Sequence, residues 1–435
     1  MESAIPQPLD AGRRLPERIL FVAVFLLTYG LNHFLSGGDP AAGSPLSEVL
    51  WAVAYAIAFG GIIAEWKTAR RLLRASLPLL FIVLLAGVSL LWSEEPAITA
   101  RRAFGLLGTS ALALHFACRL GVRGLLESLA VAISIAAVAS VPLILFVPGF
   151  GIMQAEYPGA WQGFFAHKNG LGLSMVWGIV TIVTLADRAR GFQRVLGVAL
   201  LILFGVLLIG SQCTTGIAIV VLLAVIFPIL SWCRARRSLK PAFFGAFALA
   251  AALLTGVSAG LGPDALYSAI GRDATLTGRT DVWGISIEAI GDRPVLGYGY
   301  KEFWNPEGSS DRYKQVVGWE PSSSHNGFVE VALDLGLIGE AALALLLLLA
   351  VTRAFATFLR GNDRLSAWPL CAVLFVTLAN LTEASFAKYQ TVSWVCFLAA
   401  FFFATDACQR FAALERKRAE SASVLAFTSQ RSVMS

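Results

Sequence analysis

The sequence predicts an all-α, polytopic membrane protein with about 12 transmembrane helices. Of its 435 residues, 57% are hydrophobic and only 14% are charged, and the mean hydropathy is +0.71. A single soluble core could not bury that much apolar surface. The apolar residues also form runs of about the length that one helix needs to cross a bilayer core.

Twelve such runs follow one another along the chain. They lie near residues 19–35, 48–64, 76–92, 103–118, 125–147, 170–186, 193–209, 215–232, 242–260, 328–352, 366–383 and 390–408. The predicted organisation is a cytoplasmic amino terminus at 1–18, transmembrane helices at 19–260, a large outer loop at 261–327, transmembrane helices at 328–408 and a cytoplasmic tail at 409–435.

Basic residues indicate the orientation. With the amino terminus in the cytoplasm, every inside segment carries lysine or arginine, as the positive-inside rule expects, and both termini are cytoplasmic. The basic residues sit in short clusters between apolar runs rather than on one face, which argues against nucleic acid as a partner. The outer face holds the basic residues that oppose the rule: Arg101, Arg102, Lys168, Arg272, Arg279, Arg293, Lys301, Arg312, Lys314 and Lys388.

The large outer loop contains the stretch GRTDVWGISIEAIGDRPVLGYGYKEF, residues 278–303. The spacing of its apolar residues predicts a short amphipathic helix between Thr280 and Ile290, lying at the membrane surface. Arg279 stands at the start of this helix. It is either an anion-binding residue or a solvated loop cation.

The same loop ends in SSSHNGFVEVALDLGLIGE, which places His325 and Asn326 directly before the tenth span. A histidine at this interface can act as a general base near neutral pH, because its ordinary pKa lies near 6.5. The alternative is that His325 caps or anchors the start of the helix.

A second outer segment, WQGFFAHKNGLGLSM, leads into the sixth span. It places His167, Lys168 and Asn169 together at the outer end of a helix. Lys168 could hold an anionic group. Trp161 could stack on a sugar, or it could belong to an interfacial aromatic belt.

Arg101 and Arg102 begin the fourth span on the side where the positive-inside rule disfavours them. Cations in such a place usually have an anionic partner, although Glu94 and Glu95 offer one within the chain. Arginine forks and lysine charges suit a diphosphate, so the outer cations and histidines together fit a lipid diphosphate sugar donor and a sugar acceptor. The cysteine spacing supports neither a zinc site nor a disulfide framework.

In their order along the chain, these motifs resemble the O-antigen ligase and polymerase superfamily, which includes Wzy-type exopolysaccharide polymerases. The resemblance covers about residues 91–339. The motifs are W-x-G-x-F-x-H-K-N-x-L-G from Trp161 to Gly172, G-R-x-x-x-W from Gly278 to Trp283, P-x-x-G-x-G from Pro294 to Gly299, and H-N-G with a following L-G-L-I-G from His325 to Gly339.

The resemblance implies a twelve-helix, GT-C-like glycosyltransferase of the bacterial inner membrane, with its active site facing the periplasm. Such enzymes are inverting, need no metal or other cofactor, and use an undecaprenyl diphosphate-linked glycan donor and a glycan acceptor. By resemblance, His325 assists the acceptor hydroxyl and Arg279 binds the diphosphate. Lys168 and Arg101 or Arg102 complete the anionic cradle, with His167, Asn326 and Trp161 as further substrate contacts. Other polysaccharide assembly proteins are candidate partners.

One departure bears on the choice between polymerase and ligase. Many relatives carry a basic residue in the hairpin after the seventh span, where this chain has Ser211, Gln212, Cys213, Thr214 and Thr215. We therefore expect a polymerase that joins lipid-linked repeats into exopolysaccharide. The alternative is an O-antigen ligase acting on lipid A core or another acceptor. A transporter or flippase is a second alternative, disfavoured because the ionisable residues gather at one face rather than at mid-membrane.

Overall fold

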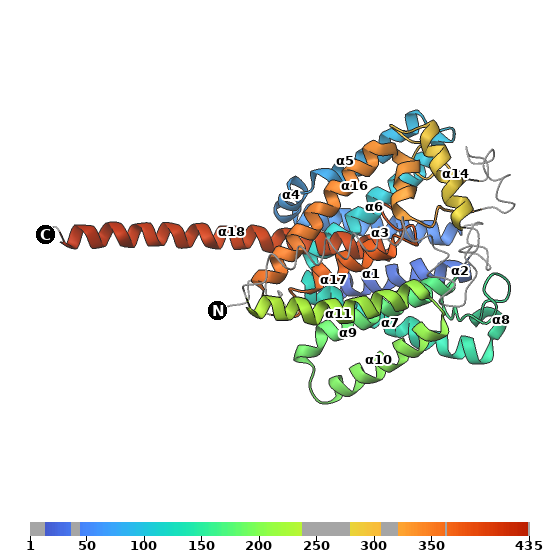
Figure 1. Ribbon diagram of the computed structural model, residues 1–435, viewed down its shortest axis with the longest axis horizontal. Coiled ribbons are helices and arrows are strands. Elements are labelled where there is room, and N and C mark those ends of the chain that lie inside the picture. Colours follow the sequence, from blue (N-terminus) through green and yellow to red (C-terminus); the bar gives the residue numbers. More distant parts are fainter. Residues whose placement is uncertain (1–13, 36–43, 237–278, 306–320, 362, 434–435) are drawn as a thin grey trace.

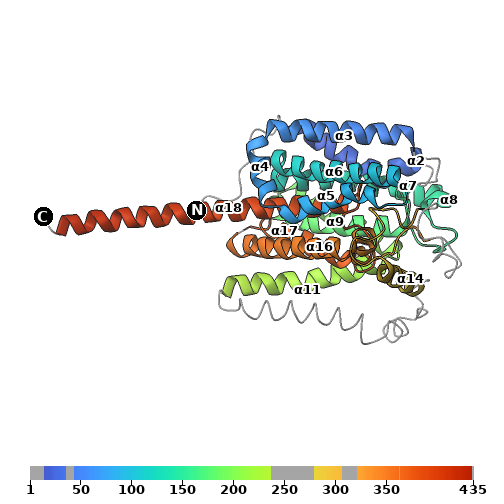
Figure 2. The ribbon, with the colours of Figure 1, turned by 90° about the horizontal axis from the view of Figure 1, so that it is seen from above.

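The computed structural model describes residues 14–35, 44–236, 279–305, 321–361 and 363–433. In these residues the chain is helical apart from turns and one isolated β-bridge, which joins Ile152 and Trp161. The helices run alongside one another in a single bundle (Figure 1, Figure 2). The all-α prediction is confirmed.

The helices of the first half are α1 (Leu15–Leu26), the π-helical η2 (Leu27–Leu31), α2 (Asn32–Leu35), α3 (Pro45–Ala64), α4 (Trp66–Arg74), α5 (Leu77–Val88), η3 (Ser89–Leu91), α6 (Pro96–Arg119), α7 (Gly121–Phe146), α8 (Pro148–Gly151), α9 (Lys168–Leu185), η4 (Ala186–Arg188), α10 (Phe192–Gly210) and α11 (Thr214–Arg236). The second half holds α14 (Arg279–Asp292), α16 (Gly327–Arg360), α17 (Trp368–Ala379) and α18 (Val392–Val433). Prolines begin several of them, where the missing N–H costs no helical hydrogen bond.

A helix covers each predicted span except the ninth, at 242–260, which lies outside the described residues. Seven of the described helices are long and apolar enough to cross a membrane. The count becomes eight if α4 and the segment Leu77–Leu91, which meet at an 89° bend, are taken as one broken span. The chain is therefore a polytopic membrane protein, while the total of twelve spans stays a prediction.

The bundle has two distinct ends. One end, here called the α4 end, carries α4 and the projecting part of α18, whereas the opposite α14 end carries α14, α8 and the loops 148–167, 293–305 and 380–391 (Figure 1, Figure 2). At the α4 end, Arg119 forms ion pairs with Glu17 at 2.7 Å and Glu65 at 3.1 Å, which joins the start of α1 to the ends of α3 and α6. The α4 end is the predicted cytoplasmic side.

The first part of α18 is the centre of the bundle. Its apolar side chains from Trp394 to Phe402 are buried, and the helix packs against α6, α16 and α17. Burial on all sides explains why this span reads as a nearly continuous apolar run rather than an amphipathic one.

Two of the glycine motifs fit together across a break in α16. Gly336 has φ +66° and ψ −170°, so it divides the helix into a short first segment and a long second one. The turn at 294–299 lies directly on this break: Leu337 N donates to Pro294 O at 2.8 Å, and Tyr298 N donates to Leu333 O at 2.9 Å. A Cβ at Gly336 would overlap Val295 O, so only glycine lets the two backbones approach this closely.

Replacing Gly336 with alanine should lower the thermal stability of the protein. Left-handed backbone costs a non-glycine residue about 1–3 kcal/mol, and the overlap with Val295 O adds to this. The measurement is the apparent Tm of purified protein in detergent. The matched control is Gly284→Ala in α14, where the added Cβ meets open space. A Gly336→Ala variant as stable as Gly284→Ala would contradict the close approach of the turn at 294–299 to the break in α16.

Candidate active site

A buried ion-pair cluster lies at the α14 end, where the loop 293–305 meets the first segment of α16. Lys301 Nζ lies 2.9 Å from Glu330 Oε1 and 2.9 Å from Asp334 Oδ2. The two carboxylates are four residues apart, which places them on one face of the helix. Burial opposes the charge of Lys301, but the carboxylates of Asp334 and Glu330 outweigh it and raise the pKa of the Lys301 amine.

Glu330 also fixes the residue that precedes His325. Its Oε2 accepts hydrogen bonds from Ser324 N and Ser324 Oγ, both at 2.8 Å, and from Trp304 Nε1 at 3.2 Å. This carboxylate therefore ties the 321–326 segment to the buried Lys301. Neither acid was expected in the site, and two carboxylates within the apolar run FVEVALDLG are the one signal in the sequence that could have indicated this cluster.

His325 itself is half-buried and has φ +51°, a left-handed conformation that most non-glycine residues avoid. Its amide donates to Ser323 Oγ at 3.4 Å. The cap of α16 is Asn326, whose Oδ1 accepts from Phe328 N at 3.0 Å and Val329 N at 3.3 Å. The helix cap, which was the alternative for His325, is thus supplied by Asn326.

Helix α14 reaches the same segment. Trp283 Nε1 donates to Ser324 O at 2.9 Å, and Val282, Ile285 and Ala289 are buried against the loop 293–305. The amphipathic helix predicted between residues 280 and 290 is present. Arg279 is the first residue of α14, four positions before Trp283 and so on the same helix face. Its side chain lies outside what the structure describes.

The predicted anion-binding segment before α9 is tightly held. His167 is the N-cap of α9: its Nδ1 accepts from Asn169 N at 3.2 Å, and its Nε2 lies 3.8 Å from Glu156. Lys168 is buried, with Nζ 3.9 Å from the centre of the Tyr157 ring and 3.3 Å from Gln212 O. Lys168 therefore lies at the hairpin that lacks a basic residue of its own.

Trp161 lies beside the same hairpin. Its amide donates to Gly210 O at 2.9 Å, and a Cβ at Gly210 would overlap the indole ring, so the ring packs directly on the end of α10. The ring is half-buried. This contact anchors the loop 148–167 to the bundle.

The two arginines at the start of α6 have different surroundings. Arg101 is exposed and pairs with Glu48 of α3 at 3.3 Å. Arg102 points to the ion-pair cluster, where Nη1 donates to Lys301 O and Nη2 lies 3.4 Å from Asn305 Oδ1. Glu94, proposed above as a possible partner for them, pairs with Arg293 at 2.7 Å instead.

The loop 380–391 joins these segments. Gly327 N donates to Asn380 O at 2.8 Å, which connects the loop to the His325 segment. Asn169 Nδ2 donates to Glu383 Oε1 at 2.6 Å, which connects it to the start of α9. Tyr300 OH donates to Ala387 O at 2.6 Å, which connects it to the loop 293–305. The structure thus brings the His325 segment and the His167–Asn169 segment against one loop.

Lys388 in this loop was not singled out as a site residue from the sequence. Its side chain is half-buried, and it makes no hydrogen bond or ion pair with another described residue. Burial and the nearby Lys301 ammonium hold the pKa of the Lys388 amine below its ordinary value. The carboxylates of Glu330, Glu383 and Asp334 act in the opposite direction, so Lys388 is a candidate contact for an anionic ligand rather than a formed anion site.

The described part of the chain contains no group of three or more histidine, cysteine or acidic residues placed to hold a metal ion. The groups that the α14 end does offer are a histidine on a constrained segment, cations and interfacial aromatic rings. These suit proton transfer and anion binding.

The chain is similar to known proteins over much of its length. Residues 197–344 match the family described as O-Antigen ligase. The "Exopolysaccharide production protein ExoQ" of Rhizobium meliloti (strain 1021) is 28% identical over 324 residues, covering 71% of each chain. The family match and this relative confirm the resemblance that the sequence motifs indicate, which is to the O-antigen ligase and polymerase superfamily.

Proposed function

We propose that this membrane protein, which is of the O-antigen ligase and polymerase type, polymerises undecaprenyl diphosphate-linked oligosaccharide repeats into exopolysaccharide. The exopolysaccharide relative supports a polymerase, as does the absence of a basic residue from 211 to 215. The family match itself supports the alternative, a ligase that transfers a lipid-linked glycan to lipid A core or another acceptor. Both reactions use the same kind of site.

The observation that carries the proposal is the arrangement around the loop 380–391. This loop contacts the segment of His325 through Asn380 and the segment of Lys168 through Glu383, and it also carries Lys388. A base and several cations at one end of the bundle match the two needs of the reaction. The acceptor hydroxyl must lose a proton, and the departing diphosphate must be stabilised.

In the proposed step, an acceptor hydroxyl attacks the anomeric carbon of the donor glycan from the face opposite the diphosphate. The hydroxyl proton passes to His325. The new glycosidic bond forms as the bond between the anomeric carbon and the diphosphate oxygen breaks, so the configuration inverts. The bonding electrons leave with undecaprenyl diphosphate, whose charge the cations balance. The α14 end would face the periplasm, with both termini in the cytoplasm.

In this proposal, the cations have different roles in binding the diphosphate. Arg279 and Lys388 bind the diphosphate directly, and Lys168 holds the substrate-facing hairpin through Gln212 O. Arg102 supports Lys301 through its backbone oxygen. Arg101 is exposed and already pairs with Glu48, so it stands at the margin of the site. His167, Asn326 and Trp161 shape the site through the start of α9, the cap of α16 and the loop 148–167.

His325→Gln should abolish long polymer in the host cell and cause lipid-linked single repeats to accumulate. Loss of general-base assistance lowers a rate by roughly 100-fold to 10,000-fold. The measurement is the size profile of lipid-linked glycans, with the variant's amount in the membrane checked in parallel. The matched control is Ser322→Ala, an exposed position three residues away that should keep the normal profile.

Two other profiles are informative for the same variant. Long lipid-linked chains that remain unattached to an acceptor would identify a ligase rather than a polymerase. A normal profile at a normal protein level would remove His325 from the chemistry.

Lys388→Gln and Arg279→Gln should each lower the rate of polymer formation by roughly 100-fold, the scale seen when one group that stabilises developing charge is removed. Arg101→Gln should lower it by less than about fivefold, because an exposed ion pair contributes little. Initial rates in isolated membranes supplied with lipid-linked repeats provide the comparison. Equal losses in Lys388→Gln and Arg101→Gln would refute the assignment of the diphosphate to the loop 380–391.

A further inference from the structure

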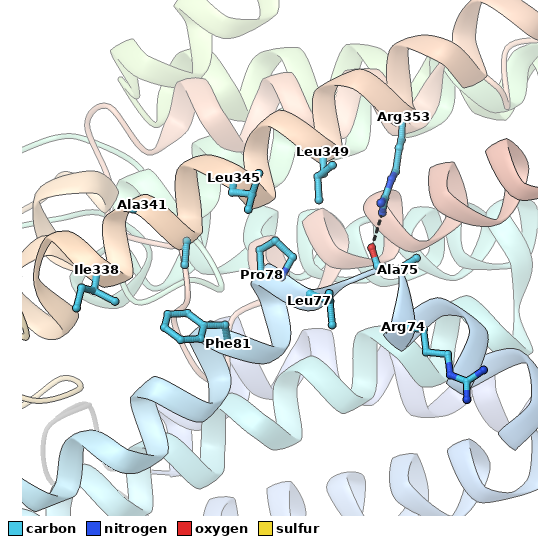
Figure 3. Close-up of a pocket in the computed structure, with 11 residues that line it drawn as sticks. Arg74, Ala75, Leu77, Pro78, Phe81, Ile338, Ala341, Leu345, Leu349 and Arg353 are labelled. Atoms are coloured by element: carbon cyan, nitrogen blue, oxygen red, sulfur yellow. Dashed lines mark hydrogen bonds between the residues drawn. The ribbon is translucent and has the colours of Figure 1, made fainter.

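A second candidate site lies between α5 and α16, away from the proposed chemistry. A groove of about 630 Å³ runs between the two helices, lined by Leu77, Pro78, Phe81, Ala341, Leu345 and Leu349 (Figure 3). Its lining extends along α16 from Ile338 to Arg353, about 22 Å at 1.5 Å per residue. This length exceeds half of a hydrocarbon core of about 30 Å, so one acyl chain fits along it.

Two arginines stand at the α4 end of the groove (Figure 3). Arg353 Nη1 donates to Ala75 O and to Thr405 Oγ1, both at 2.9 Å, so its described hydrogen bonds go to neutral oxygens. Arg74 is exposed and makes no ion pair with another described residue. The groove is thus apolar along its length and positively charged at one end.

The helix that carries Arg74 has the character of a membrane-surface helix. In the sequence WKTARRLLR of α4, Ala69 and Leu72 are buried, while Trp66, Lys67, Arg70 and Arg74 are exposed. The helix meets the following segment at 89°, which lays it across the end of the bundle. A basic amphipathic helix in this position lies in the interface, where its cations attract anionic headgroups.

We propose that the groove between α5 and α16 binds an anionic phospholipid, with one acyl chain along the apolar lining and the headgroup phosphate at Arg74. Charge at the mouth and apolar lining behind it match the two parts of such a lipid. The polyprenyl tail of the donor is the rival occupant. It fits less well, because under the proposed function the donor's diphosphate binds at the α14 end, opposite the two arginines.

The test is native mass spectrometry of the full-length protein with equal amounts of phosphatidylglycerol and phosphatidylcholine. Wild type should retain phosphatidylglycerol in preference. Arg74→Gln should reduce that preference roughly fivefold, the factor for one basic residue near an anionic lipid surface. Arg70→Gln is the matched control, since Arg70 is also exposed on α4 but does not line the groove. Equal retention of the two lipids by wild type, or equal losses in both variants, would overturn the proposal.

A second pair of variants tests the acyl chain. Ala341→Trp fills the groove and should abolish retention of the lipid. Ala344→Trp, at an exposed position on α16 that does not line the groove, should leave it unchanged. Retention of phosphatidylglycerol by Ala341→Trp would show that the lipid binds outside the groove. Displacement of phosphatidylglycerol by undecaprenyl phosphate would show that the groove binds the polyprenyl lipid. Either result would overturn the proposal. These results are independent of polymer formation, which the variants of His325 and Lys388 report.

Discussion

The α14 end depends on one buried ammonium. Lys301 lies between Glu330 and Asp334, and each carboxylate also fixes backbone: Glu330 holds Ser324, and Asp334 Oδ1 accepts from the amide of Lys301 at 3.1 Å. Removing one partner of a buried ion pair typically costs about 3–5 kcal/mol, because the remaining charge has no compensation. The cluster thus orders the loop 293–305, the first segment of α16 and the segment of His325 together.

The fold class could be predicted because each membrane-spanning helix is a long apolar segment of the sequence, and hydropathy alone locates such segments. The sequence showed that glycines mark turns, but it could not show that two glycine-containing segments pack against each other. Gly297 and Gly336 lie far apart in the chain, and the need for both appears only where the turn at 294–299 meets the break in α16. The predicted spans 366–383 and 390–408 leave only residues 384–389 for the α17–α18 connection. It is the longer loop 380–391, because α17 ends at Ala379.

The candidate site was predicted less completely. The described cations that oppose the positive-inside rule lie at the α14 end, and a charge that is costly to place there needs a reason. The sequence could not distinguish a cation that pairs with a carboxylate of the protein from one that could bind a ligand. The distinction depends on partner residues that are distant in the chain. Lys301 is neutralised by α16, Arg101 by Glu48, and Lys388 by no described residue. Glu330 and Asp334 were missed because the apolar run around them resembles an ordinary span.

Through Glu330 and Ser324, the ion-pair cluster of Lys301 holds the His325 segment in its conformation. The most direct measurement is hydrogen exchange of the amides in residues 321–330, on full-length protein in lipid nanodiscs, comparing Lys301→Met with Lys388→Met. Loss of the cluster should speed exchange about 100-fold or more in Lys301→Met, and Lys388→Met should match wild type. Unchanged exchange in Lys301→Met would contradict the account, because the segment would then be ordered without the buried ammonium.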